Sequence, residues 1–179
     1  EPVIGDAMPD HYRNKAQYPV QQGPHRLIIG FYAPHSHRIV EQRDCLLQPT
    51  IFRNILDIVA KWAKMAGVSA YDETMGQGLL RHIYIRQAQA TGEIMVCLVC
   101  TSGKLPKTHE LIETMRDGVP GLASLIVNIN RENTNVVLGE TGFALWGADY
   151  IMDELCGLRL RLSPHSFYQV NSAQAERLY

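Results

Sequence analysis

The sequence contains no apolar run of the length that crosses a membrane, and no basic segment followed by an apolar one. No membrane-spanning helix is therefore expected, no signal peptide is visible, and we expect a cytoplasmic protein that is monomeric. Cysteine is scarce, with four residues in 179, which argues against a disulfide scaffold and favours a reducing compartment. The chain does not begin with Met, so we interpret it as a piece of a longer protein.

The overall composition, with 46% apolar and 20% charged residues, is typical of a globular chain that can bury a core. The formal net charge of −1 hides an uneven distribution, because residues 11–40 contain four Lys or Arg, four His and no Asp or Glu. A basic segment on an acidic body indicates a contact with an anion or a nucleic acid. A solvent-exposed basic face, whose charges are neutralised by acidic side chains nearby in the folded protein, explains the same distribution equally well.

Hydrophobic patterns predict an α+β fold with a mixed, largely antiparallel sheet. The first helix is expected over residues 49–66, with Gly67 ending it, and the second over residues 107–117. Between residues 26 and 130 the predicted order is the split βαβ order of ferredoxin-like folds, with extra strands at both ends. The expected strands are 12–20, 26–32, 38–41, 79–90, 93–101, 122–130, 136–139, 145–152 and 158–162.

Several short motifs carry little information about chemistry. Cys97 and Cys100 have the spacing of a metal knuckle, but residues three apart on a strand point to opposite faces, which favours two core cysteines. His35 and His37 would lie on one side of an extended chain, either as metal ligands or in a solvated, phosphate-facing loop. No nucleotide loop, catalytic triad or pair of catalytic carboxylates stands out.

Many strings, in order along nearly the whole chain, resemble one family, the RNA uracil-5-methyltransferases, and in particular their RumA-type 23S rRNA branch. The most specific string covers residues 163–171, SPHSFYQVN. The other strings are 12–17 (YRNKAQ), 30–32 (GFY), 36–37 (SH), 44–48 (DCLLQ), 78–83 (GLLRHI), 91–93 (TGE), 128–130 (NIN), 134–135 (TN), 147–151 (GADYI) and 174–176 (QAE).

This resemblance implies that residues 1–165 are the central, RNA-contacting domain of an S-adenosylmethionine-dependent enzyme. Residues 166–179 would begin the segment that leads into a Rossmann-like methyltransferase domain. In the family a thiolate adds to C6 of uracil, C5 takes the methyl group, and a base then removes the C5 proton. The nucleophilic Cys and the base would lie beyond Tyr179, so we expect the chain alone to be inactive.

The resemblance also implies roles for individual residues. Phe167 corresponds to an aromatic residue that stacks on the extruded target base, and Gln169 to a glutamine that contacts S-adenosylmethionine. The alternative for this stretch is an ordinary strand, followed by a helix that Asn171 caps. Cys45 stands where many relatives place the fourth ligand of a [4Fe–4S] cluster, whose other three cysteines would precede Glu1. The alternative is a small buried residue.

The expected partner is RNA, most specifically 23S rRNA. Arg13 and Lys15 alternate on one face of an extended chain, so both are predicted to reach phosphates, as is His37. The alternative substrate is tRNA, because the rRNA and tRNA branches of the family share the segment around Phe167. A stand-alone RNA-binding module without a catalytic partner is the alternative from a different class.

Overall fold

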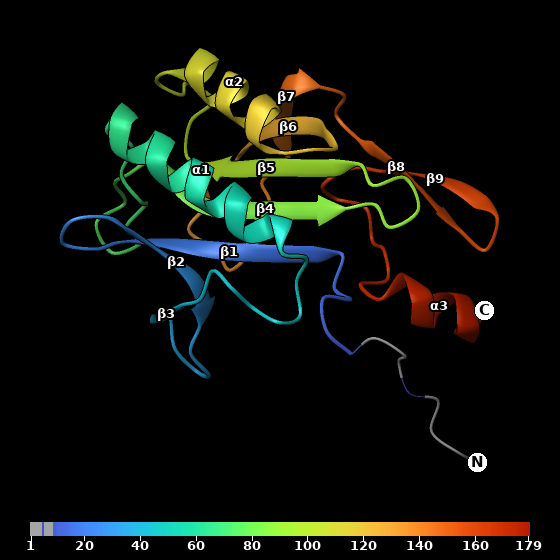
Figure 1. Cartoon of the computed structure of the whole chain (residues 1–179). Helices are drawn as coiled ribbons and strands as arrows, with labels where there is room; N and C mark the ends of the chain where they lie inside the picture. The colour runs from blue at the N-terminus through green and yellow to red at the C-terminus, as the bar shows by residue number, and fades with distance from the viewer. Residues whose placement is uncertain (1–4, 6–8) are drawn as a thin grey trace.

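The computed structural model describes residue 5 and residues 9–179, and it shows one large sheet with two helices on one face (Figure 1). The sheet has seven strands in the order β3-β2-β1-β4-β5-β6-β7, and β8 and β9 form a separate two-stranded sheet. The strands are Lys15–Gln22 (β1), Leu27–Tyr32 (β2), Ile39–Glu41 (β3), Leu80–Gln87 (β4), Ile94–Cys100 (β5), Leu122–Ile129 (β6), Thr141–Gly147 (β7), Ile151–Leu155 (β8) and Leu158–Leu162 (β9). The helices are Ile51–Ala66 (α1), Thr108–Gly118 (α2) and Ser172–Leu178 (α3).

The predicted class is confirmed, because all sheet pairings are antiparallel except the parallel pair of β5 and β6. The first βαβ unit, β2–α1–β4, is split by β1, which lies between its two strands. The second unit, β5–α2–β6, is not split, since its strands are direct neighbours. No helix of the described residues is both long and apolar enough to cross a membrane.

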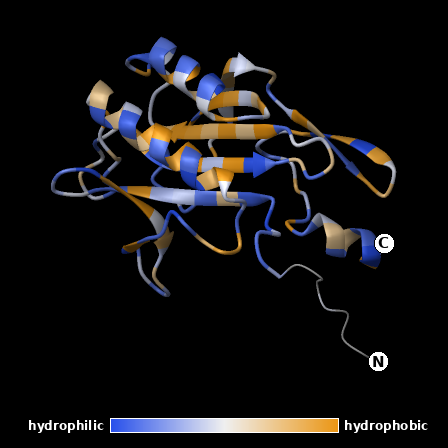
Figure 2. Cartoon of the chain, viewed as in Figure 1, coloured by the Kyte–Doolittle hydropathy of each residue, from blue (hydrophilic) through white to orange (hydrophobic). Residues whose placement is uncertain are grey.

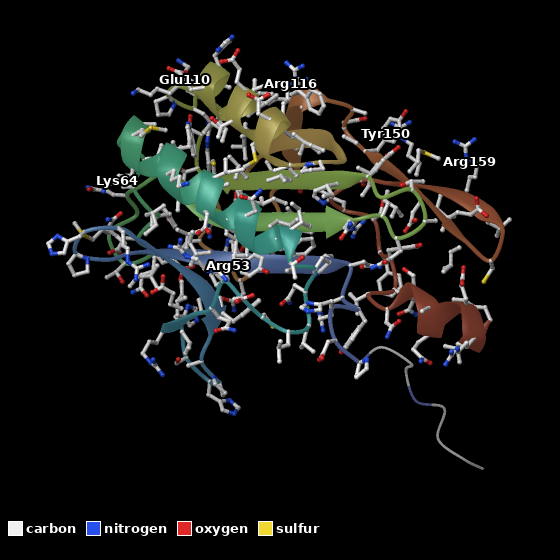
Figure 3. All side chains as sticks on the ribbon, viewed as in Figure 1. Arg53, Lys64, Glu110, Arg116, Tyr150 and Arg159 are labelled. Carbon is white, nitrogen blue, oxygen red and sulfur yellow. The ribbon has the colours of Figure 1, made fainter. Side chains whose placement is uncertain are left out.

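The helices and one face of the sheet enclose the larger core. Helix α1 buries Phe52, Ile55, Val59 and Trp62, which recur at helical spacing, and Gly67 ends it with a φ of 67° as predicted. Figure 2 shows β5 as a largely apolar central strand and α1 as a helix along which apolar and polar residues alternate. Helix α2 is tied to the far edge of the sheet by Arg116, labelled in Figure 3, whose guanidinium lies 5.6 Å from the ring of Trp146.

The opposite face of the sheet carries a second, smaller core, which the β8–β9 hairpin and α3 cover. The side chains of β5 alternate between the two cores, so Cys97 lies in the second and Cys100 in the first. The expectation that these two cysteines face opposite ways is therefore confirmed. Burial raises the pKa of both thiols, to about 12 for Cys100, which suits inert core residues.

Two predicted strands were wrong. Residues 136–139 form no strand, because asparagine side chains satisfy their backbone instead: Asn128 bonds both the N–H and the C=O of Gly139, and Asn130 donates to the C=O of Val136. Residues 145–152 are not one strand either. The chain leaves the sheet at Gly147, whose φ of 73° and close approach to the Ala123 carbonyl exclude a side chain, and β8 starts at Ile151.

One buried titratable group makes the fold sensitive to acid. His82 on β4 is 7% exposed, and burial together with the neighbouring charge of Arg81 lowers its pKa to about 4. The unfolded chain binds this proton near the ordinary value of about 6.5, so stability is lost as the pH falls from there towards 4.

We expect His82→Gln to reduce this loss by about 3 kcal/mol at most, because each pKa unit corresponds to about 1.4 kcal/mol. Urea unfolding of both proteins at pH 7 and pH 4.5 measures the difference. An identical pH dependence in the two proteins would show that His82 is not buried in its neutral form.

Candidate functional site

The segment with the most specific string, residues 163–171, leaves β9 and crosses the second face of the sheet towards α3. Arg86 on β4 holds its first half. The Arg86 side chain is 1% exposed, and it donates from Nη1 to the Ser163 carbonyl at 3.0 Å and from Nη2 to the Ser166 carbonyl at 2.7 Å. No carboxylate pairs with Arg86 within the described residues, so its charge is directed at this piece of backbone.

Tyr168 anchors the middle of the segment. Its ring is buried, and its hydroxyl donates to Asp153 Oδ2 at 3.0 Å. Asp153 is itself 1% exposed and also accepts from the N–H groups of Gln89 and Ala90 at 3.1 and 2.9 Å. Burial and the hydrogen bond to Asp153 raise the pKa of Tyr168 to about 12, so the hydroxyl keeps its proton and remains a donor.

Asn14, directly before β1, anchors the end of the segment. Its Nδ2 donates to the Gln169 carbonyl at 2.8 Å and to Ser172 Oγ at 3.0 Å, and its N–H donates to the Val170 carbonyl at 2.9 Å. Asn14 is completely buried. The start of β1 and the start of α3 are therefore joined, although more than 150 residues separate them in the sequence.

Between these anchors Phe167 is left 84% exposed. A large apolar ring on a backbone held at both sides presents a fixed aromatic face to solvent, as stacking on a nucleobase requires. Gln169 is partly buried and donates from Nε2 to the Tyr179 hydroxyl at 3.3 Å. The alternative of a strand here was wrong, since residues 167–170 join no sheet, whereas Asn171 does cap α3 by accepting from the Gln174 N–H.

Two of the predicted RNA-binding residues lie next to this segment. Lys15 stands opposite Arg86 in the β1–β4 ladder, and burial with the nearby charges of Arg86 and Arg13 lowers its pKa. Arg13 and Lys15 line one hollow of about 370 Å³, and Cys45 lies in the same hollow. The structure therefore brings Arg13, Lys15 and Cys45 together at the start of β1, where Asn14 bonds the backbone of the 163–171 segment.

His37 lies elsewhere. It lies in the turn between β2 and β3, and its Nδ1 lies 3.3 Å from Glu73 Oε2. Arg26, another cation of the basic segment, pairs with Glu41. Part of that segment is thus balanced by acids in space, while Arg13 and Lys15 form no ion pair within the described residues.

The described residues do not by themselves form a site for either expected cofactor. Gln169 offers a single amide and Phe167 is 84% exposed, so S-adenosylmethionine would need further protein around these two residues. Cys45 is a free thiol, and no group of three His, Cys, Asp or Glu gathers as a metal site in the part of the chain that the structure describes.

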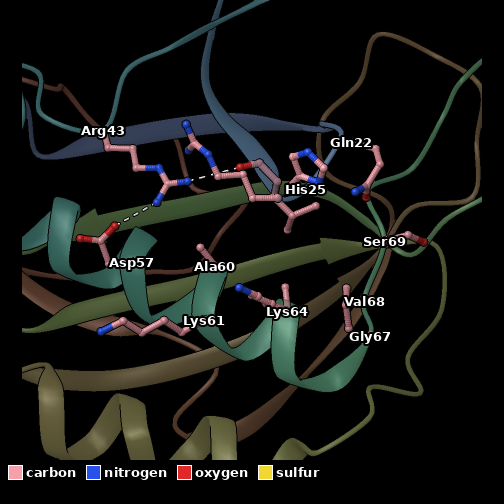
Figure 4. Close-up of a pocket in the computed structure, with 13 residues that line it drawn as sticks. Gln22, His25, Arg43, Asp57, Ala60, Lys61, Lys64, Gly67, Val68 and Ser69 are labelled. Atoms are coloured by element: carbon pink, nitrogen blue, oxygen red, sulfur yellow. Dashed lines mark hydrogen bonds and ion pairs between the residues drawn. The ribbon is translucent and has the colours of Figure 1, made fainter.

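The largest hollow, of about 670 Å³, lies between α1 and the hairpin of β1 and β2 (Figure 4). Its wall includes the ion pair of Arg43 and Asp57 at 3.0 Å, together with Lys61 and Lys64. It contains none of the residues predicted to contact RNA or cofactor. We therefore place the candidate site at the 163–171 segment and the adjacent start of β1.

Sequence reasoning missed the three anchors Asn14, Arg86 and Asp153. The available signal for Arg86 was a charged residue near the end of a predicted strand, but Arg81 and His82 on the same strand gave a similar signal. Asn14 gave a weaker one, because it lies inside the string at residues 12–17, between the two cations that drew attention. Nothing in the spacing of Asp153 indicated that its carboxylate would be buried.

The chain is similar to part of several named proteins, although no family model matches it. It is 42% identical over 179 residues to a protein of Clostridium tetani named as an uncharacterized RNA methyltransferase. It is 40% identical over 177 residues to one of Caldanaerobacter subterraneus subsp. tengcongensis with the same description. The matches cover 100% and 99% of this chain but 39% of each relative.

A solved structure shares the fold. The crystal structure of Pyrococcus abyssi tRNA (uracil-54, C5)-methyltransferase in complex with S-adenosyl-L-homocysteine matches with a TM-score of 0.80 and 24% sequence identity. The match covers 98% of this chain and 41% of that one. By sequence the chain is thus similar to proteins named as RNA methyltransferases, and it spans about two fifths of their length.

Proposed function

We propose that the chain is the central domain of an S-adenosylmethionine-dependent RNA uridine C5-methyltransferase that acts on 23S rRNA. In this proposal residues 1–165 contact RNA, and residues 166–179 begin the connection to the catalytic domain. The observation that carries the proposal is the exposed ring of Phe167 on a backbone that Arg86, Tyr168 and Asn14 hold in place. The relatives named as RNA methyltransferases support it.

The chain's own residues would bind and orient the RNA. Phe167 offers a stacking face for the extruded uracil, and Arg13 and Lys15 offer positive charge for the phosphates on either side of it. Gln169 would contact the cofactor with its amide. S-adenosylmethionine, when bound, supplies the methyl group, and the thiolate and the base that complete the reaction would come from protein outside this chain.

A tRNA substrate is a second candidate. The observation that favours it is the fold shared with an enzyme whose description names a tRNA uracil as its target. The proposed [4Fe–4S] cluster, with Cys45 as one ligand, would belong to the longer protein. The position of Cys45, partly buried beside Arg13 and Lys15, leaves the thiol near the proposed RNA path.

Methyl transfer by the protein encoded by the whole reading frame tests the proposed function. We expect it to transfer radiolabelled methyl groups from S-adenosylmethionine to 23S rRNA at C5 of uridine. The rate of transfer to tRNA should be at least about tenfold lower, which corresponds to about 1.4 kcal/mol of discrimination. Methylation of tRNA alone would establish the second candidate. Absence of transfer to both RNAs, by a folded protein that binds them, would leave a non-catalytic RNA-binding module.

The role of Phe167 can be tested in the chain itself. Phe167→Ala should weaken binding of uridine-containing single-stranded RNA by about fivefold to a hundredfold, because stacking of one base contributes about 1–3 kcal/mol. Fluorescence anisotropy measures this, and the fold should be unaffected because the ring is 84% exposed.

The matched control is Leu178→Ala, which removes another exposed apolar side chain, 75% exposed, from α3. It should leave the affinity unchanged. An equal loss of affinity in both variants would mean that general apolar contact, and not stacking on Phe167, explains the binding.

A further inference from the structure

A second polar hollow lies on β4 away from the 163–171 segment. We call it the Arg81 pocket; it measures about 250 Å³, and its wall includes Tyr32, His37, Tyr71, Glu73, Arg81 and His82. His82 and Arg86 share a face of β4 four residues apart, which separates the pocket from the candidate site by about 14 Å. The pocket is smaller than the about 300–1,000 Å³ typical for a drug-sized ligand, so one planar ring system is a suitable occupant.

A buried cation forms the floor of the pocket. The side chain of Arg81 is 2% exposed, and its Nη1 donates to the Asn130 and Glu132 carbonyls at 3.2 and 2.6 Å. Its Nη2 lies 4.0 Å from Glu73 Oε1, which is too far for a hydrogen bond. Arg81 Nη2 and Glu73 Oε1 thus lie side by side without a hydrogen bond between them, while Glu73 Oε2 lies 3.3 Å from His37 Nδ1. Nη2 can donate to a ligand, and Oε1 can accept from one.

His82 adds a polar group that the protein leaves unused. Its Nδ1 is enclosed and forms no hydrogen bond within the described residues. Buried polar groups are hydrogen-bonded in most proteins, so an unpartnered one in the wall of a hollow indicates a missing ligand or water. Its lowered pKa keeps the imidazole neutral at pH 7, which avoids a second positive charge next to Arg81.

Aromatic rings form the sides of the pocket. Tyr32 is 45% exposed, and its ring centroid lies 5.6 Å from that of His37, while the ring of Tyr71 lies 4.6 Å from the Arg81 guanidinium. Flat rings around a set of donors and acceptors are what proteins use to recognise an unpaired nucleobase, by stacking on its face and bonding its edge. A phosphate would need the donors but not the carboxylate or the rings.

We propose that the Arg81 pocket binds an unpaired guanine base of the RNA substrate, at a distance from the target uridine. Guanine carries, along one edge, the O6 acceptor for Arg81 and the N1–H and 2-amino donors for the Glu73 carboxylate. Adenine has an amino group in place of O6 and lacks the 2-amino group, and uracil offers the carboxylate one N–H. This inference rests on the proposed function, because it assumes that the chain binds RNA.

Binding of short RNAs to the full chain tests the inference. The probes are fluorescein-labelled uridine nonamers with a single guanosine, inosine or adenosine, and anisotropy gives the affinities. We expect guanosine to bind about tenfold more tightly than adenosine, as hydrogen bonds to charged groups allow, with inosine in between because it lacks the 2-amino group. Glu73→Gln should reduce the preference for guanosine over adenosine to less than about twofold.

The matched control is Glu110→Gln, which removes another exposed carboxylate, from α2, where Figure 3 labels Glu110. It should keep the full preference for guanosine. Equal affinities of the wild-type chain for guanosine and adenosine RNAs would overturn the guanine pocket and leave the proposed function standing. Failure to bind any of the RNAs at low salt would overturn both. Glu73 is exposed, so its replacement should not prevent folding.

Discussion

The geometry of the candidate site depends on burying the charge of Arg86 against backbone carbonyl groups and the ring of Tyr84. A guanidinium that is 1% exposed must satisfy its donors within the protein, and two of them bond the carbonyls of Ser163 and Ser166. Releasing the segment would leave this charge unpaired in the interior, which costs several kcal/mol. The chain around residue 166 is therefore bound to the sheet by electrostatics as well as by packing.

The other features of the site follow from this attachment. Because the backbone is held by Arg86, and by Asn14 and the Asp153–Tyr168 pair further along, the side chain between the anchors has no interior position left, and Phe167 faces solvent. The antiparallel pairing of β1 with β4 places Lys15 opposite Arg86, so the positive end of β1 lies beside the same segment. The cations at the start of β1 and the fixed backbone that carries Phe167 thus lie at one end of the second face.

The local elements could be predicted from the sequence, but the long-range contacts could not. Helix α1 could be predicted from the helical spacing of its apolar residues and from Gly67 at its end. The opposite orientation of Cys97 and Cys100 could be predicted because successive side chains of a strand point to opposite faces. The interactions of Asn14 with Gln169 and of Asp153 with Tyr168 join distant parts of the chain, and no local pattern encodes them. The prediction of a strand at residues 136–139 was wrong for the same reason. The side chains of Asn128 in β6 and of Asn130 directly after β6 bond the backbone of these residues.

Hydrogen exchange of the Ser163 and Ser166 amides, whose N–H groups bond Ser166 Oγ and the Ser163 carbonyl, tests most directly whether buried polar anchors fix the segment. The informative comparison is between the wild-type chain and Tyr168→Phe, which removes one hydrogen bond to Asp153 and keeps the buried ring. We expect both amides to exchange about fivefold to tenfold faster in the variant, as the loss of about 1 kcal/mol implies, while the amides of β4 and β5 are unaffected. Unchanged exchange at both amides would contradict the role of buried polar anchors in fixing the segment.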